Sequence, residues 1–197
     1  KVLNNEEKIF ILGAGSNTLI NDKLFDGVVI QLAENFNNIS LLREEIIVAG
    51  SAVLDNSLSN FAMKNNIGGF EFLSCIPGTI GGGIKMNAGC FGKEFKDILI
   101  SIQTIDNFGN IRTIPSNKIK FNYRENNLSD NLIFLSASFK GYSSNLKKIE
   151  IEMNKLKLLK KKNQPTKIKT SGSTFKNPIM QTEKKVWELI KESVPLD

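Results

Sequence analysis

Short apolar runs separated by polar turns recur through the first part of the chain. Runs at 8–12, 27–32 and 46–49 predict buried strands, each followed by small or turn-forming residues. Between 54 and 62 the apolar side chains instead recur at helical spacing, and Gly68-Gly69 predicts a stop after that helix. This part of the chain therefore predicts strands mixed with a crossover helix.

The next apolar runs predict a different connection. Runs at 98–105 and 111–114 flank the turn-forming residues 106–110, which predicts a β-hairpin. A further strand is predicted at 132–139. The chain therefore mixes strands joined through a helix, as in an α/β unit, with strands joined by a hairpin.

Two helices are predicted near the end of the chain. An apolar stripe from Leu146 to Leu159 predicts a long helix that Pro165 ends, and residues 163–170 are interpreted as a linker. A short helix is predicted at 182–193, with these side chains facing inward: Val186, Trp187, Leu189 and Ile190. The opposite face of the long helix is rich in lysine. A nucleic-acid surface is one interpretation of that face, but a solvated face is favoured because no base-stacking aromatic residues interleave with the lysines.

Two glycine-rich stretches stand out against this pattern. Gly13–Asn17 follows the first strand directly, and residues 76–89 hold five of the 15 glycines, so they are predicted to form neither an ordinary helix nor a strand. Glycine lets backbone N–H groups approach phosphate oxygens closely, and two such stretches favour a large phosphorylated cofactor. Simple tight turns are the alternative. A Rossmann fingerprint would need glycine where Thr18 stands, and neither stretch ends in the Gly-Lys-Ser/Thr of a P-loop.

Composition narrows the chemistry further. The 197 residues contain no histidine and only two cysteines, which excludes Ser-His and Cys-His catalysis and zinc sites of the usual kinds within this sequence, so no metal site is predicted. Cys75 and Cys90 flank the second glycine stretch and are interpreted as small apolar fillers; such sparse cysteine favours the reducing cytoplasm. The net charge of +6 fits an anionic ligand. No apolar run approaches the ~20 residues that span a bilayer, so we expect no membrane partner.

Four fragments, taken in chain order, carry a resemblance. After Gly13–Asn17 come Gly69-Phe70-Glu71-Phe72-Leu73 running into Ile76-Pro77-Gly78-Thr79, then Phe121–Arg124, then Gly172–Pro178. Together they resemble the UDP-N-acetylenolpyruvoylglucosamine reductase (MurB) family of bacterial cell-wall precursor synthesis, over residues 8–192. The resemblance implies the α+β fold class, with a vanillyl-alcohol-oxidase (PCMH) type FAD-binding fold in two α+β subdomains, 1–68 and 69–142. The start of a substrate-binding domain would follow at 143–197.

The resemblance also implies which residues contact FAD. They lie in the two glycine stretches: Gly13, Ala14, Gly15, Ser16, Asn17, Ile76, Pro77, Gly78, Thr79, Gly81, Gly82, Asn87, Ala88 and Gly89. For Asn87, a plain turn residue is an equally weighted interpretation.

The reaction of the family reduces an enolpyruvyl ether of a UDP-sugar, with NADPH as the source of hydride. Hydride addition leaves an enolate-like carbanion that must be stabilised and protonated. Arg124 matches the catalytic arginine of the family, Ser173 matches its proton donor, and Asn177 matches a residue that contacts the UDP-sugar. Tyr123 and Lys176 are expected to bind substrate at the same site, Tyr123 by lining it and Lys176 by adding charge. Without the resemblance, a surface ion pair and a cap would be the favoured interpretations of Arg124 and Ser173.

The sequence also departs from the family. The catalytic glutamate of the family and the rest of its substrate domain have no counterpart in these 197 residues, nor does its N-terminal Arg-x-Gly-Gly segment, so we expect an incomplete enzyme. The alternatives are another flavin oxidoreductase of the same fold and a basic nucleic-acid-binding protein. The leading expectation is a monomeric, cytoplasmic flavoenzyme with a UDP-sugar substrate and no nucleic-acid partner.

Overall fold

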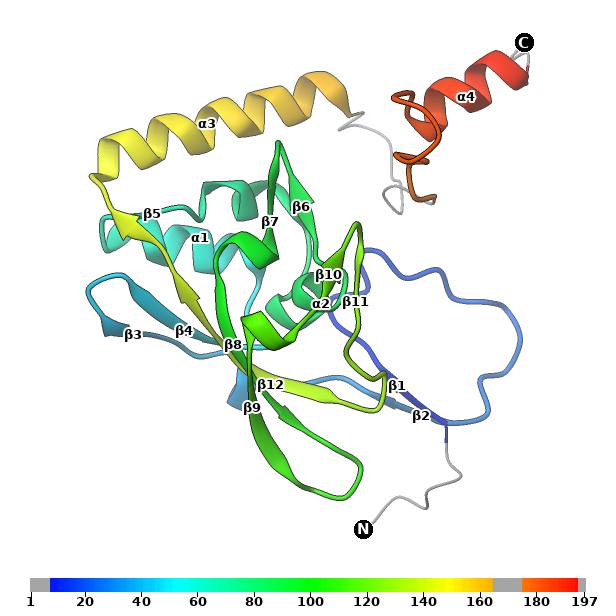
Figure 1. Cartoon of the computed structure of the whole chain (residues 1–197), viewed down its shortest axis with the longest axis horizontal. Helices are drawn as coiled ribbons and strands as arrows, with labels where there is room; N and C mark the ends of the chain where they lie inside the picture. Colours follow the sequence, from blue (N-terminus) through cyan, green and yellow to red (C-terminus); the bar gives the residue numbers. More distant parts are fainter. Residues whose placement is uncertain (1–7, 165–174, 195–197) are drawn as a thin grey trace.

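A five-stranded antiparallel sheet forms the centre of the computed structural model, which describes residues 8–164 and 175–194 (Figure 1). The strand order is β3-β4-β12-β8-β9. The bounds in that order are Ile39–Arg43, Ile46–Gly50, Ile133–Lys140, Leu99–Ile105 and Ile111–Pro115. The predicted strands at 46–49, 98–105, 111–114 and 132–139 are confirmed. β3 was not predicted, because Leu41 and Leu42 face solvent at the sheet edge and break the alternation of apolar and polar positions.

The predicted hairpin between β8 and β9 is also confirmed, and Asp106 organises its turn. The Asp106 Oδ1 accepts from the N–H groups of Phe108 at 2.9 Å and Asn110 at 3.0 Å, and Oδ2 pairs with Arg112 at 2.7 Å. The hydrogen bonds from Asn110, followed by those from Arg112 and Phe108, lower the pKa of Asp106 to about 2.

Two helices pack on one another above the sheet. The predicted helices are confirmed as α1 (Asp55–Lys64) and α3 (Leu146–Asn163), and both contact the 3-10 turn η2 (Glu71–Cys75). The core between helices and sheet is aromatic at its centre, where the rings of Phe95 and Phe139 lie 6.1 Å apart between centroids. Figure 1 shows α3 along the top of the molecule with α1 between it and the sheet.

A separate parallel pair precedes the sheet. β1 (Ile9–Ile11) and β2 (Val28–Ile30) pair in register at the two predicted positions. The prediction that they are buried is wrong, because Phe10 is 42% and Val29 is 52% exposed at this separate pair, which lies outside the central sheet. The remaining strands form three two-stranded ribbons: β5 (Ile67–Gly68) with β13 (Tyr142–Ser143), β6 (Gly89–Cys90) with β7 (Lys93–Glu94), and β10 (Phe121–Asn122) with β11 (Glu125–Asn126). Three further 3-10 turns are η1 (Glu34–Phe36), η3 (Phe95–Asp97) and η4 (Ser116–Lys118).

The glycine stretch at 76–89 corrects one prediction, because it contains the helix α2 (Ile80–Lys85). None of its glycines has a positive φ. Their role there is to leave room: a Cβ on Gly83 would lie 2.3 Å from the ring of Phe95, and one on Gly81 would lie 3.1 Å from the Ser51 side chain. Gly83 therefore allows the helix to pack where a side chain would collide, and Gly81 avoids a tight contact.

The last helix corrects a second prediction. α4 (Val186–Ser193) begins four residues later than predicted, and none of its residues is buried. Trp187 is 60% exposed and Ile190 is 41% exposed, so these two side chains do not face inward within the described part of the chain. The helix is amphipathic, but no described element covers its apolar face.

Strands from both predicted subdomains share the central sheet. β3 and β4 come from the range 1–68 and the other three strands from 69–142, with β4 paired to β12. The two ranges therefore have a common core, and the boundaries stay a prediction. The linker interpretation at 163–170 falls mostly outside the described residues, as does Pro165.

Candidate functional site

The two glycine stretches, more than sixty residues apart in sequence, lie against each other. The Ser16 hydroxyl donates a hydrogen bond of 2.5 Å to the carbonyl oxygen of Pro77. A Cβ on Gly13 would lie 2.7 Å from the Thr79 Oγ1, so any other residue at this position would force the Thr79 side chain to shift. The carbonyl of Gly13 in turn accepts from the Gln31 side chain at 2.9 Å, which ties the first loop to the segment after β2.

The first loop offers a row of free donors. Among residues 8–164 and 175–194, no acceptor bonds the backbone N–H groups of residues 13–17. Gly15 has a φ of +70°, and no atom lies within 4 Å of its Cβ position. Such a row of exposed N–H groups suits anionic oxygens, so this loop fits a diphosphate. On the facing element, Gly82 has only Thr79 near its Cβ position, at 3.6 Å, which leaves that side of α2 open.

An unpartnered carboxyl lies under the second loop. Asp55 is fully buried at the first residue of α1, and neither of its carboxyl oxygens has a hydrogen-bond partner in the described chain; the same holds for the Ser51 hydroxyl. The Cβ position of Gly78 lies 3.0 Å from Asp55 Oδ2. Burial raises the pKa of Asp55 to about 8. The carboxyl is therefore mostly neutral at pH 7 and does not repel an anion in the loop above it.

Sequence reasoning missed Asp55, because an aspartate in the first turn of a helix is ordinarily an exposed, ionised residue. The apolar neighbours Val53, Leu54 and Leu58 are the signal that could have shown its burial.

Arg124 lies in a strained turn. The ribbon β10–β11 pairs Asn122 with Glu125, so Tyr123 and Arg124 alone form the connection. Arg124 has a φ of +59°, a value that a two-residue hairpin turn normally assigns to glycine or asparagine. Backbone strain of this kind in a non-glycine residue is concentrated at functional sites.

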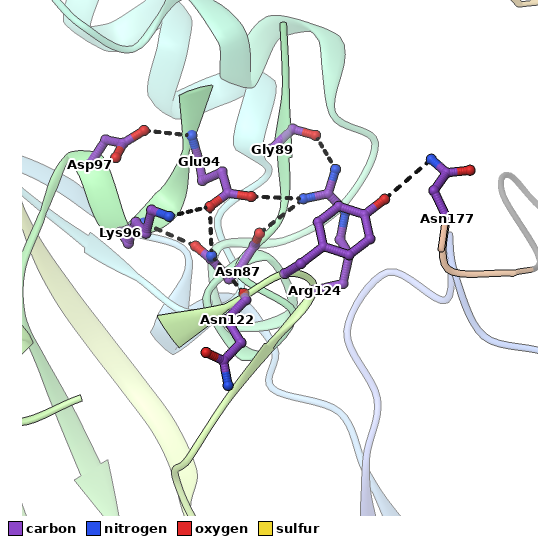
Figure 2. Close-up of polar contacts among 9 residues, drawn as sticks. Asn87, Gly89, Glu94, Lys96, Asp97, Asn122, Arg124 and Asn177 are labelled. Carbon is purple, nitrogen blue, oxygen red and sulfur yellow. Dashed lines mark hydrogen bonds and ion pairs between the residues drawn. The ribbon is translucent and has the colours of Figure 1, made fainter. Parts of the chain in front are cut away.

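The guanidinium of Arg124 reaches the end of the second glycine stretch (Figure 2). Its Nη2 donates to the carbonyl of Gly89 at 2.8 Å, and its Nη1 donates to the carbonyl of Asn87 at 3.2 Å and lies 3.5 Å from Glu94 Oε1. The Nε–H and one N–H of Nη2 have no acceptor among the described residues. These two donors are sufficient for a bidentate contact with one carboxylate.

Asn87 is fully buried, and both polar atoms of its side chain are hydrogen-bonded within the protein. Its amide donates to Glu94 Oε2 at 2.9 Å and to the carbonyl of Asn122 at 3.1 Å, while its Oδ1 accepts from the backbone N–H of Lys96 at 3.1 Å. These contacts favour a structural role over the direct cofactor contact that was its other interpretation.

The residues expected to bind substrate also gather around this turn. The Asn177 amide donates to the Tyr123 hydroxyl at 3.3 Å, and Lys176 pairs with Glu125 at 3.0 Å, a contact that lowers the pKa of Glu125. The Arg124 guanidinium lies 4.9 Å from the centroid of the Tyr123 ring. Ser173, the matched proton donor, lies outside the described residues.

Both cysteines are free thiols. Burial, together with the neighbouring Cys75, raises the pKa of Cys90 to about 12, so this thiol is not a nucleophile at neutral pH. In the described ranges, no group of three or more acidic or cysteine side chains could hold a metal ion. None of the helices described is both long and apolar enough to cross a bilayer.

Known proteins with similar sequences agree with the residue-level resemblance. A UDP-N-acetylenolpyruvoylglucosamine reductase of Pelagibacter ubique is 66% identical over 197 residues, which is all of this chain and 65% of the relative. The enzyme of the same name from Rickettsia conorii is 46% identical over 98% of the chain and 64% of its own length. The chain thus spans just under two thirds of the length of these curated relatives.

Solved structures give the same picture of the fold. The MurB structure from Thermus caldophilus matches 96% of this chain and 67% of its own, with a TM-score of 0.84 and 29% identity. A carbon monoxide dehydrogenase from Hydrogenophaga pseudoflava shares the fold over 68% of this chain and 52% of its own, with a TM-score of 0.52 and 16% identity. The model of the FAD binding domain matches residues 2–115. The chain therefore belongs to the FAD binding domain family, within which it resembles the UDP-N-acetylenolpyruvoylglucosamine reductases.

Proposed function

We propose that this chain is the FAD-binding part of a reductase that uses NADPH to reduce UDP-N-acetylenolpyruvoylglucosamine in peptidoglycan precursor synthesis. The observation that carries the proposal is the meeting of the two glycine loops, at Ser16 with Pro77 and at Gly13 with Thr79. The similarity to reductases of that name supports the substrate. The two free cysteines support the cytoplasm, and we expect a monomer by size-exclusion chromatography.

The residues present fit the cofactor. The unbonded N–H groups of residues 13–17 would face its diphosphate, the neutral Asp55 would not oppose that charge, and Gly82 would allow α2 to approach it. When bound, FAD supplies hydride transfer from NADPH to the enolpyruvyl double bond.

Arg124 would bind the substrate carboxylate with its two unpaired donors and stabilise the negative charge that develops on it. Its planar fork holds such a group in one orientation, as a lysine cannot. Ser173 would donate the proton to the carbanion, and Tyr123, Lys176 and Asn177 would position the sugar nucleotide.

The cofactor assignment is tested by titrating FAD into a Gly82→Val variant. Valine in place of Gly82 projects two methyl groups into the open side of α2, so FAD affinity should be lost. Gly109→Asn is the matched control, because Gly109 lies in the β8–β9 turn with a φ of +84° and no atom near its Cβ position. Unchanged FAD affinity in Gly82→Val would show that the cofactor binds elsewhere.

A further inference from the structure

The end of the second glycine stretch is built around a partly buried carboxylate that sequence reasoning did not single out. Glu94, in β7, bonds the Asn87 amide through Oε2, and its Oε1 faces the Arg124 guanidinium (Figure 2). Its own N–H donates to Asp97 Oδ2 at 2.9 Å, which fixes the start of η3. The Glu94 side chain is only 20% exposed.

The backbone of Asn87 is held in an unusual conformation by hydrogen bonds of its own side chain. Its φ is +40°, so its carbonyl is turned out of the regular path that follows α2 and towards Arg124. The three side-chain bonds to Glu94, Asn122 and Lys96 come from separate elements and fix that orientation. An asparagine tolerates this backbone region better than most residues, and here its amide also supplies the anchoring bonds.

We propose that Asn87 and Glu94 are positioning residues for Arg124, holding its guanidinium so that its remaining two donors face a substrate carboxylate. Asn87 accepts a hydrogen bond from Arg124 through its backbone carbonyl. Glu94 attracts the guanidinium by its charge and also accepts a hydrogen bond from the Asn87 side-chain amide, which holds Asn87 in place. The inference rests on the proposed function, since Arg124 needs an anionic substrate to act on. The contacts with Asn87 and Glu94 explain why the guanidinium of Arg124, in its strained turn, keeps one orientation.

Lys96 provides an internal control for the charge of Glu94. Its ammonium pairs with Glu94 Oε2 at 2.9 Å, and that contact raises the pKa of Lys96. The Lys96 side chain is 46% exposed and pairs with the Glu94 oxygen that Arg124 does not face. Only the backbone N–H of Lys96 bonds Asn87, and a side-chain substitution preserves it.

Side-chain NMR can read the position of Arg124 without any turnover. The sequence has only three arginines, Arg43, Arg112 and Arg124, so arginine-labelled protein gives a simple spectrum that the Arg124→Lys variant assigns. A guanidinium held at both Nη atoms rotates slowly and shows separate Nη resonances. These should be separate in the wild type and in Lys96→Gln, and averaged in Glu94→Gln and Asn87→Gly.

Stopped-flow kinetics on the intact, flavin-loaded enzyme provides the second measurement. In Glu94→Gln, reoxidation by the enolpyruvyl substrate should slow by roughly 10–10²-fold, the effect of misplacing a charge-stabilising group by about 1 Å. FAD content and reduction by NADPH should stay at the wild-type level. Asn87→Gly should behave in the same way, since glycine keeps the positive φ at no steric cost and removes only the side-chain bonds.

Several outcomes would overturn the inference. It is wrong if Arg124 keeps separate Nη resonances in both Glu94→Gln and Asn87→Gly, or if both variants reoxidise at the wild-type rate. A purely structural role predicts equal losses in FAD content and in both half-reactions. If the wild-type protein binds no FAD, or is never reoxidised by the substrate, the proposed function is wrong. The NMR spectra then still test whether Asn87 and Glu94 hold the Arg124 guanidinium in place.

Discussion

Replacing Asp55 by asparagine should change how the stability of this protein depends on pH. Asp55 is fully buried with no partner for either oxygen, and burial raises its pKa from 3.8 to about 8. Between these two values the folded chain holds a proton that the unfolded chain has released. The unfolded state thus binds fewer protons, so the free energy of unfolding falls as pH rises through this window.

The size of the effect follows from the same values. One proton of difference corresponds to about 1.4 kcal/mol per pH unit, so Asp55 should lower the free energy of unfolding by about 3 kcal/mol between pH 5 and pH 7. Asparagine is neutral throughout and has no such slope. Its buried amide donors lack partners, which costs about 1–3 kcal/mol at every pH and shifts the whole curve without tilting it.

Urea unfolding of the flavin-free protein at pH 5, 6, 7 and 8, followed by circular dichroism, measures this slope. Flavin must be absent because a ligand of the folded state adds its own contribution. The stability of Asp55→Asn relative to wild type should rise with pH. Asp106→Asn is the control: the pKa of Asp106 is lowered to about 2, so its contribution is lost only at acidic pH and is constant from pH 5 to 8. Parallel curves for Asp55→Asn and wild type would refute the reasoning.

Three further predictions concern the glycine helix and the catalytic assignments. Gly83→Ala should destabilise the fold by about 1–3 kcal/mol, because its Cβ would lie 2.3 Å from the Phe95 ring. Gly82→Ala is the control: no atom lies nearer than 3.6 Å to its Cβ position, so this variant should unfold at the same urea concentration as wild type or a higher one. Equal losses of stability in the two variants would contradict this. Arg124→Lys should slow reoxidation by the substrate strongly and reduction by NADPH much less, as stopped-flow flavin absorbance would show. Ser173→Ala should slow the same reoxidation by roughly 10²–10⁴-fold with FAD content unchanged, and a wild-type rate would assign the proton to another group.

Most of the fold was predictable because its elements are locally specified. The β8–β9 hairpin depends on an aspartate turn whose bonds all lie within six residues, and α1 and α3 on apolar stripes at helical spacing. α2 was missed because glycine has low intrinsic helix propensity. Its helical form depends on tertiary contacts with Phe95 and Ser51, which no local pattern contains.

The residues of the site also divide into those that a local pattern predicts and those that depend on long-range contacts. Glycine pattern and family resemblance identified the loops, Tyr123 and Arg124, and the structure brings them to one region. Asp55 was missed although its sequence neighbours are apolar, and Glu94 was missed because no local pattern shows which carboxylate a distant turn will cover. Both depend on long-range contacts: Asp55 on a loop 23 residues later, and Glu94 on a turn 30 residues later.

The second glycine stretch links the two halves of the proposed site through one continuous piece of backbone. Its first part meets the loop at residues 13–17, and its last carbonyls, at Asn87 and Gly89, hold Arg124. Between them α2 is fastened at its C-terminal end by Asn126, whose amide donates to the carbonyls of Ile84 at 3.0 Å and Lys85 at 2.9 Å. Because Asn126 lies in the same ribbon as Arg124, the arginine and the helix are held by one element. A cofactor seated on α2 would therefore have a fixed distance to the arginine, and this is the geometric requirement for stabilising charge that forms beside it.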